Sequence, residues 1–212
     1  AMNPIATFCK LVTREEVLAS RPIAEPLTLL QCCPAVVDGA AAVVLTTRPS
    51  KGRAKPIRIL ASIVQSGIFE PGIVDITEAE ITSRAAKMAY EAAGVGPQDL
   101  SLIELHDAFT ISELLYYEAL GLCGRGEAQH LLTSGATALG GRIPVNPSGG
   151  LIAKGHPPGA TGLAQIVEIC EQIQERAGKR QIPNARIGLS QVTGGGISGV
   201  DHAACSIHIL SA

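Results

Sequence analysis

Apolar residues recur along this chain in two patterns, a helical spacing of three to four residues and short continuous runs. The helical spacing predicts amphipathic helices, and the continuous runs predict buried strands. We expect three long helices, over residues 77–93, 109–122 and 160–177. We expect strands over residues 38–47, 57–64, 102–105, 187–192 and 203–210.

Capping residues and glycines mark the ends of these predicted elements. Residues 77–80, Thr-Glu-Ala-Glu, have the form of a capping box at a helix start. Gly94, followed three residues later by Pro97, is a typical helix stop, and Gly178 is expected to end the third helix. Near the start of the chain, Thr13 to Glu16 predicts a second capping box on a short helix.

Residues 38–47 form a run of small and apolar residues, Asp-Gly-Ala-Ala-Ala-Val-Val-Leu-Thr-Thr, that predicts a buried strand. A strand with two apolar faces needs neighbours, and no partner strand precedes it in the sequence. We therefore expect the chain to begin part-way through a larger fold. After the polar segment 48–52, strands and helices alternate, which predicts an α/β fold with a mixed sheet covered by helices and right-handed crossovers.

The composition fits a buried α/β sheet. The 212 residues are 46% hydrophobic but 3% aromatic, so the core must consist of Ala, Val, Ile and Leu. The net charge of −2 argues against a nucleic acid as partner. No apolar run approaches the ~20 residues of a membrane span. Six cysteines without a CxxC pair are typical of a reduced compartment, and we expect a cytoplasmic protein.

Three loops carry the residues best suited to chemistry, at strand ends or helix starts where α/β folds place their sites. These loops are residues 105–109 (Leu-His-Asp-Ala-Phe), residues 146–162 around Gly-His-Pro, and residues 193–196 (Thr-Gly-Gly-Gly). His106 precedes the second helix, and Asp107 is placed to be the N-cap of that helix. His156 precedes the third helix, whose positive N-terminal end favours a neutral imidazole. Such a ring serves as a general base or a hydrogen-bond donor, and the glycine turn offers bare backbone amides.

Two other readings of the motifs fail on particular residues. The spacing of Gly150 and Gly155 is that of a phosphate-binding P-loop, but His156 and Pro157 stand where a lysine and a hydroxyl residue are required. His202, Cys205 and His208 have the composition of a metal site. On one strand, however, residue 205 faces away from residues 202 and 208, so no single metal ion could bind all three.

The three loops together resemble the C-terminal half of the thiolase family, with His-Asp-Ala-Phe, Asn-Pro-Ser-Gly-Gly-x4-Gly-His-Pro-x-Gly-Ala-Thr-Gly and Gly-Gly-Gly in the same order. The sterol-carrier-protein and archaeal-type branch is the most similar. The resemblance implies a thiolase-like C-terminal half with a mixed five-stranded sheet. Residues 1–50 would be a remnant of the N-terminal half, including its last strand, and residues 51–212 the C-terminal domain.

Thiolases join or cleave acyl-CoA thioesters by Claisen chemistry, so the resemblance implies an acyl-CoA, a coenzyme A thioester, as substrate, with no covalent cofactor and no metal. By this resemblance His156 activates a nucleophilic cysteine, His106 holds a water or the thioester oxygen, and Gly194 donates an amide to a second oxyanion. Substrate-binding positions carried over from the family are these: Ala108, Phe109, Ser148, Gly149 and Gly195.

Two departures from the family pattern limit this reading. No cysteine of the chain stands in the setting of the family's nucleophile, which belongs to the N-terminal half. The acid/base cysteine is also missing: Val192 replaces it in the Cys-x-Gly loop, and Ala108 stands where one branch carries it instead. Without a nucleophile there is no acyl-enzyme. We therefore expect a chain that is inactive alone, whose partner is the missing N-terminal half or a separate chain, and which forms a homo-oligomer.

Two further hypotheses stay open from the sequence. One is a non-catalytic thiolase-like module that binds an acyl-CoA or sterol-CoA or acts as a scaffold, which fits the missing acid/base cysteine. The other is a thiolase-like lyase that cleaves steroid side-chain CoA thioesters by a retro-aldol reaction. Lyases of that kind are expected to use tyrosines in the loops, and His106 argues mildly against this last hypothesis.

Overall fold

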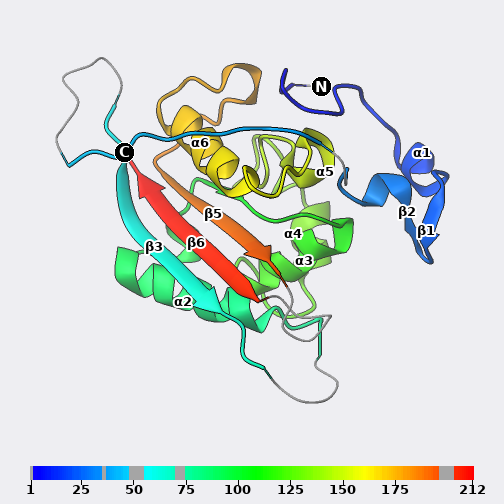
Figure 1. Cartoon of the computed structure of the whole chain (residues 1–212), viewed down its shortest axis with the longest axis horizontal. Helices are drawn as coiled ribbons and strands as arrows, with labels where there is room; N and C mark the ends of the chain where they lie inside the picture. Colours follow the sequence, from blue (N-terminus) through cyan, green and yellow to red (C-terminus); the bar gives the residue numbers. More distant parts are fainter. Residues whose placement is uncertain (1, 35–36, 48–54, 70–74, 196–202) are drawn as a thin grey trace.

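The computed structural model describes residues 2–34, 37–47, 55–69, 75–195 and 203–212. Helices and strands alternate through most of the chain, as Figure 1 shows. The helices are α1 (Arg14–Leu18), α2 (Glu80–Ala93), α3 (Thr110–Ala119), α4 (Ala128–Thr133), α5 (Gly150–Lys154) and α6 (Thr161–Ile173), with 3-10 turns at Leu29–Gln31, Pro97–Asp99 and Gly178–Arg180. The strands are β1 (Pro22–Ala24), β2 (Leu27–Thr28), β3 (Arg58–Ser66), β4 (Leu102–Glu104), β5 (Ile187–Gly194) and β6 (Ala204–Ser211).

Four of these strands form one mixed sheet in the order β3-β6-β5-β4. Strand β6 runs antiparallel to both β3 and β5, whereas β4 and β5 are parallel. The mixed α/β architecture and the positions of these four strands confirm the prediction. Nearly every boundary falls within two residues of the expected one.

The predicted fifth strand is wrong among the described residues. Next to β4, its place is taken by a single parallel bridge between Ile103 and Val145. Pro144 and Pro147 lie on either side of this bridge. Pro144 has no N–H to donate, so the ladder cannot extend on that side. On the other side the N–H of Leu105 donates to the Asn146 side chain, at 2.8 Å, and not to a backbone carbonyl.

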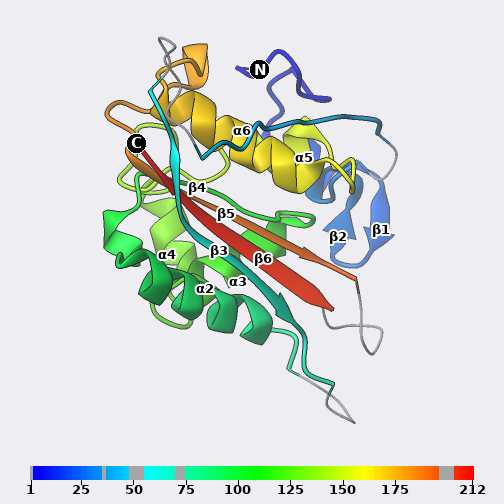
Figure 2. The same ribbon diagram turned by 60° about the vertical axis from the view of Figure 1, so that its left-hand side comes forward.

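The sheet is the middle of three layers (Figure 2). Helices α2 and α3 pack on one face, where Ala85, Ala89, Leu105, Tyr117 and Ile207 are buried in the larger core cluster. Helix α6 packs on the other face, through a smaller cluster that includes Leu102, Ile169 and Ile173. Alanines on α2 allow that helix to approach the sheet closely, in line with the aliphatic composition.

Helix ends follow the sequence signals only in part. Thr13 and Glu16 form the predicted capping box, and Gly94 ends α2 with φ +66°. The box predicted at residues 77–80 is wrong: the N-cap of α2 is Ala79, without a side-chain hydrogen bond, and the Thr77 hydroxyl donates to Asp75 instead. Helix α6 ends before Gly178, because Glu175 already takes the left-handed conformation with φ +59°.

Residues 38–47 do not form the predicted strand. They lie as an extended segment alongside α6 (Figures 1 and 2), and Val44 is 93% exposed. A pattern of small and apolar residues becomes a strand only where another strand pairs with it, and no described strand lies beside this segment. We call residues 2–47 the N-terminal arm, with 35 and 36 outside the described part. Among the described helices, none is long and apolar enough to cross a membrane.

Candidate active site

His106 lies just beyond the end of β4, and its backbone is held by a side chain of β5. Its N–H donates to Oε1 of Gln191 on β5 at 3.0 Å, and Nε2 of Gln191 donates to Thr82 of α2 at 3.2 Å. Both Gln191 and Thr82 are fully buried, so this chain of hydrogen bonds is shielded from water. His106 is 7% exposed and lines a pocket at this edge of the sheet.

His156 follows α5, after a glycine that turns the chain. Gly155 has φ +105°, a conformation that side chains rarely adopt, and a Cβ there would lie 2.7 Å from Thr7 Oγ1. The His156 ring is held by Thr161, the first residue of α6, with Nδ1 and Oγ1 2.8 Å apart. Burial lowers the pKa of His156 below its ordinary value, so the ring is neutral near pH 7.

Thr161 also bears on which ring nitrogen of His156 carries the proton. The Thr161 hydroxyl donates to the carbonyl of Pro157 at 3.0 Å. With that proton directed to Pro157, Nδ1 of His156 is the donor in the bond to Thr161. Nε2 is then left with a free lone pair, which is the form required of a general base.

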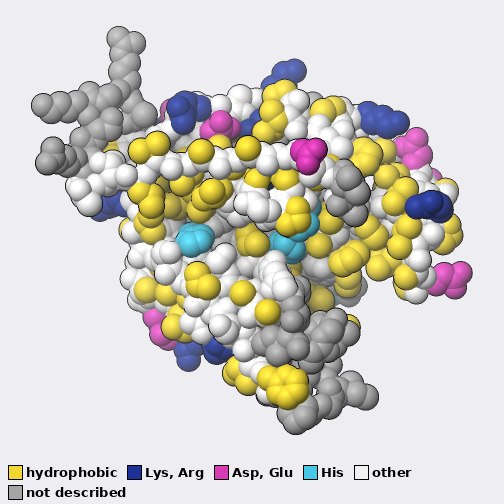
Figure 3. Space-filling model, in the orientation of Figure 1, with side chains coloured by type: hydrophobic (Ala, Val, Ile, Leu, Met, Phe, Trp, Pro, Cys, Tyr) yellow, Lys and Arg dark blue, Asp and Glu magenta, His cyan; other side chains and the backbone are white. Residues whose placement is uncertain are grey.

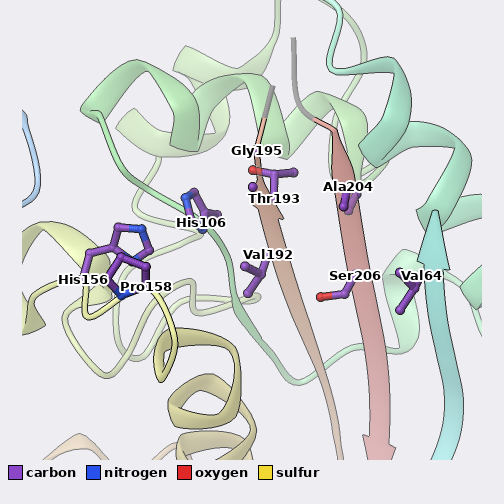
Figure 4. Close-up of a pocket in the computed structure, with 11 residues that line it drawn as sticks. Val64, His106, His156, Pro158, Val192, Thr193, Gly195, Ala204 and Ser206 are labelled. Atoms are coloured by element: carbon purple, nitrogen blue, oxygen red, sulfur yellow. The ribbon is translucent and has the colours of Figure 1, made fainter. Parts of the chain in front are cut away.

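The two imidazole rings contact each other. Their centroids lie 4.9 Å apart and their planes are inclined by 87°, an edge-to-face arrangement. Figure 4 shows His106 and His156 side by side at one end of the pocket. Fifty residues separate them in the sequence, and the tertiary structure brings them together as the motifs predicted.

The pocket has a volume of about 550 Å³ and opens on the uncovered part of the sheet. Its floor is a row of cross-strand neighbours, Val64 of β3, Ser206 of β6 and Val192 of β5 (Figure 4). Val64 is 68% exposed. In Figure 3, histidine side chains are visible at the surface of this face, with apolar side chains around them. A base is therefore placed beside an apolar, accessible surface.

Gly194 and Gly195 lie at the rim of this pocket, at the end of β5. Both are exposed, and Gly195 has φ +71°. A Cβ at residue 195 would lie 2.9 Å from the Cβ of Ala203, so glycine fits this turn. Gly196, the third glycine of the motif, lies outside the described residues. Backbone groups at the rim are thus accessible beside the two histidines.

Asp107 does not cap the helix that follows it, which corrects the prediction. The N-cap of α3 is Phe109, and the Asp107 carboxylate accepts hydrogen bonds from the backbone N–H groups of Leu151, at 2.7 Å, and Ile152, at 3.4 Å. It therefore caps α5, the helix before His156. A Cβ on Gly150 would lie 2.1 Å from this carboxylate, which explains the glycine there. Burial raises the pKa of Asp107 to about 8, against the effect of the two amides.

The remaining predicted site residues lie around this centre. Ser148 and Gly149 line a second, smaller cavity of about 220 Å³. Ala108 accepts a hydrogen bond from the N–H of Cys33 at 2.9 Å, and Phe109, 44% exposed, bridges to Cys32. The main pocket is therefore lined by His106, His156, Gly194 and Gly195 from the predicted set.

The one cysteine that lines the pocket is Cys205, and its thiol lies in the large core cluster, 3.7 Å from the Thr82 hydroxyl. Val192, which stands in place of the acid/base cysteine of the family pattern, occupies the pocket floor. No group of three or more metal-binding side chains exists among the described residues. His202 lies outside the described residues.

Sequence reasoning missed three residues that shape this site. Gln191 holds the backbone of His106, Thr161 holds the ring of His156, and Glu104 binds the loop around Ser148. Thr161 carried a signal, because it stands in the Gly-Ala-Thr-Gly motif. Gln191 and Glu104 carried a weaker one: each is a polar residue inside a strand that is otherwise buried.

Known proteins are similar to this chain over most of its length. The family model described as "Thiolase C-terminal domain-like" matches residues 72–208. The benzoylsuccinyl-CoA thiolase subunit BbsB of Thauera aromatica is 44% identical over 210 residues, 96% of this chain and 54% of that protein. The acetyl-CoA acetyltransferase of Methanothermobacter thermautotrophicus is 42% identical over 212 residues, 99% of this chain and 54% of its own length.

Two further relatives extend the range of activities. Sterol carrier protein 2 of Oryctolagus cuniculus is 44% identical over 200 residues, 91% of this chain and 36% of that protein. Among solved structures, the Ltp2-ChsH2(DUF35) aldolase matches with a TM-score of 0.82 and 27% identity, over 100% of this chain and 55% of the matched chain. The chain thus spans about half or less of the length of these relatives.

Proposed function

The chain belongs to the thiolase family, and on that premise we propose that it is the C-terminal portion of an acyl-CoA thiolase. The reaction would be the Claisen condensation of two acyl-CoA thioesters or the thiolytic cleavage of a 3-ketoacyl-CoA. The observation that supports this best is the contact between two imidazoles, one with a free Nε2 lone pair, beside accessible backbone groups of a glycine turn. A base and oxyanion donors are the groups that acyl transfer requires.

Each residue has a role in this proposal. Nε2 of His156 takes the proton of a nucleophilic thiol, which then forms an acyl thioester. His106 donates to the thioester oxygen, directly or through a water, and the Gly194 amide stabilises the second oxyanion. Ala108, Phe109, Ser148, Gly149 and Gly195 contact the acyl-CoA. During condensation the new C–C bond forms as the C–S bond of the acyl thioester breaks, and the released thiolate recovers a proton.

Among the described residues that line the pocket, the two histidines are the groups suited to take the proton from the carbon next to the thioester. Val192 lies at the pocket floor where the family pattern has an acid/base cysteine, and it cannot accept a proton. His156 has the free lone pair for this step, and its lowered pKa keeps it unprotonated near pH 7. We assign this second transfer to His156.

We also propose that the nucleophilic thiol comes from an N-terminal thiolase half, in the same protein or in a partner chain. The uncovered row of Val64, Ser206 and Val192 is the surface on which that half would pack. Residues 1–50 would then be the end of that half and residues 51–212 the C-terminal domain. A homo-oligomer of the assembled enzyme completes the proposal.

A thiolysis assay tests these assignments. The chain is incubated with acetoacetyl-CoA and free CoA, alone and together with an N-terminal thiolase half that carries the cysteine, and the acetyl-CoA formed is measured by mass spectrometry. We expect product only from the combination. His156→Ala should lower the rate by roughly 10²- to 10⁴-fold. His130→Gln, on the exposed surface of α4, is the control and should leave the rate unchanged.

Turnover by the chain alone, or full activity of His156→Ala, would contradict the proposal. If acyl-CoA binds to the chain but no product forms, either from the chain alone or from its combination with the N-terminal half, a non-catalytic acyl-CoA or sterol-CoA module is favoured instead.

The retro-aldol lyase is the second candidate, and one observation favours it: the structural similarity to the Ltp2-ChsH2(DUF35) aldolase. Thiolysis consumes free CoA, whereas retro-aldol cleavage of a 3-hydroxyacyl-CoA releases an aldehyde or ketone without it. We therefore expect no cleavage of a steroid side-chain 3-hydroxyacyl-CoA when free CoA is left out. Release of a ketone under these conditions would favour the lyase, with a DUF35-type partner as the chain to test first.

A further inference from the structure

Two opposite charges are buried between the segments that carry the histidines. The Glu104 side chain is 1% exposed and that of Lys154 is 9% exposed, with Oε2 and Nζ 3.7 Å apart. Charged groups removed from water at such a depth need hydrogen-bond partners and a counter-charge. These two residues come from different elements, the end of β4 and the end of α5.

Ser148 connects the two charges. Its backbone N–H donates to Glu104 Oε1 at 2.9 Å, and its hydroxyl donates to Oε2 at 2.7 Å. Nζ of Lys154 donates to the same hydroxyl oxygen at 3.1 Å. An amide, a hydroxyl and an ammonium group therefore converge on Glu104, and each of them is a donor. Such a site suits an ionised carboxylate, although burial raises the pKa of Glu104.

The position of this cluster in the chain is the informative point. Glu104 lies two residues before His106, and Lys154 lies two residues before His156. Residues two apart in an extended backbone project to the same side, which applies to Glu104 and His106. One ionic contact therefore joins the two segments directly next to the point where the imidazoles meet.

We propose that Glu104 and Lys154 are positioning residues that, through Ser148, hold His106 and His156 in contact. The effect on catalysis rests on the proposed function, but the effect on the rings is a property of this chain alone. Neither residue would touch the substrate. Their action is to fix two loops relative to each other, since a small misplacement of a catalytic group can cost a large factor in rate.

The chain offers a matched control for the general cost of disturbing a buried ion pair. Arg180 and Glu168 are 9% and 5% exposed, and their charged atoms are 2.8 Å apart. This pair joins α6 to the turn at Gly178–Arg180, and its hydrogen bonds go to neither histidine segment. The charges of Glu168 and Arg180 also act on Glu104. A variant of Glu168 nevertheless disturbs a buried charge without removing a hydrogen bond between the two loops.

The first experiment uses the 212-residue chain, labelled with ¹⁵N and ¹³C at histidine, and follows the cross-peak between the ring protons of His106 and His156 by NMR. Glu104→Gln and Lys154→Met should each lose this cross-peak, while Glu168→Gln should keep it. The double variant Glu104→Gln/Lys154→Met leaves no unpaired charge, so its thermal midpoint should recover towards that of the parent while the cross-peak stays absent.

Several outcomes would overturn the proposal. One is a cross-peak that persists in either folded single variant. Another is a double variant that recovers both its thermal midpoint and its cross-peak. If the single variants do not fold, the double variant decides. A double variant that also fails to fold would show that the charges serve folding rather than the position of the rings.

The second experiment repeats the thiolysis assay with the same variants in the combination that turns over. We expect kcat to fall roughly tenfold while KM changes little, because geometry and not binding is lost. If the parent does not turn over, the proposed function fails and the NMR result still tests the positioning. If the cross-peak is lost while kcat is unchanged, the positioning has no catalytic role and the catalytic part of the proposal falls.

Discussion

The N-terminal arm and the rest of the chain contain similar apolar residues but bury them to different extents. In residues 55–212 the aliphatic side chains fill two clusters on the faces of one sheet. In the described part of the arm, the buried side chains are two polar ones, Asn3 and Thr28. The large apolar residues of the arm that are exposed are Met2, Ile5, Phe8, Leu11, Val12, Leu18, Ile23, Leu29, Val44 and Leu45. Apolar composition therefore produces a core only where layers of secondary structure face each other.

We call residues 55–212 the body. The arm is attached to the body through backbone and polar contacts at the two histidine segments. Nδ2 of Asn3 donates to the carbonyl of Ser148 at 2.8 Å, and the N–H of Thr7 donates to the carbonyl of Lys154 at 3.1 Å. Cys33 bonds to Ala108 in the other segment. The difference between the regions teaches that the body supplies the stability, whereas the arm acts locally on the loops of the site.

The largest effect should come from a cavity in the body. Ile169→Ala removes a fully buried side chain between α6 and the sheet, and we expect the free energy of unfolding to fall by about 2–5 kcal/mol. The matched change in the arm, Leu11→Ala, affects a side chain that is 89% exposed and should cost less than about 0.5 kcal/mol. Urea unfolding followed by circular dichroism measures both. Equal losses would break the distinction between body and arm.

A smaller effect is expected where body and arm hold the same loop. Asp107→Ala removes the cap of α5 and should cost about 1–2 kcal/mol, whereas Asp107→Asn keeps an acceptor and should cost less. In the arm, Asn3→Ala removes one hydrogen bond to this loop, and its cost should be about 0.5–1.5 kcal/mol. The same unfolding assay ranks the three. A larger loss for Asn3→Ala than for Asp107→Ala would reverse the roles that we assign to the two regions.

The smallest effect concerns the charge of His156. Burial lowers its pKa in the folded state, so below pH 6.5 the unfolded chain takes up a proton more readily than the folded one. The stability that comes from the neutral ring is present above pH 6.5 and is lost as the pH falls through the lowered pKa. His156→Gln should therefore flatten the dependence of the unfolding midpoint on pH between 7.5 and 5. An NMR titration that gives His156 a pKa above 6.5 would contradict this.

The sequence by itself determined the local elements and the motifs. Helices α2, α3 and α6 and strands β3 to β6 follow from apolar spacing, because side-chain periodicity reflects which face of one element is buried. The three loops could be found because glycines and histidines at strand ends are rare enough to notice. The family followed from the same motifs, which the match over residues 72–208 confirms.

The tertiary structure decided what depends on neighbours far away in the chain. Residues 38–47 have the sequence of a strand and lack a partner, so they stay extended and exposed. Asp107 could cap the helix that follows it, but the fold places it at α5, and Gly150 leaves room for it there. Strand β4 gains one bridge at Val145 in place of a fifth strand.

The same limit applies to the site. His106 and His156 were identifiable as candidates, but their contact and the free Nε2 of His156 depend on Thr161, Gln191 and the packing of β4 against β5. Glu104 and Lys154 are separated by fifty residues, and no local pattern predicts that they share one serine. Spacing along a sequence records which residues share a face of one helix or strand. Which faces then meet is determined by the packing free energy of the whole fold.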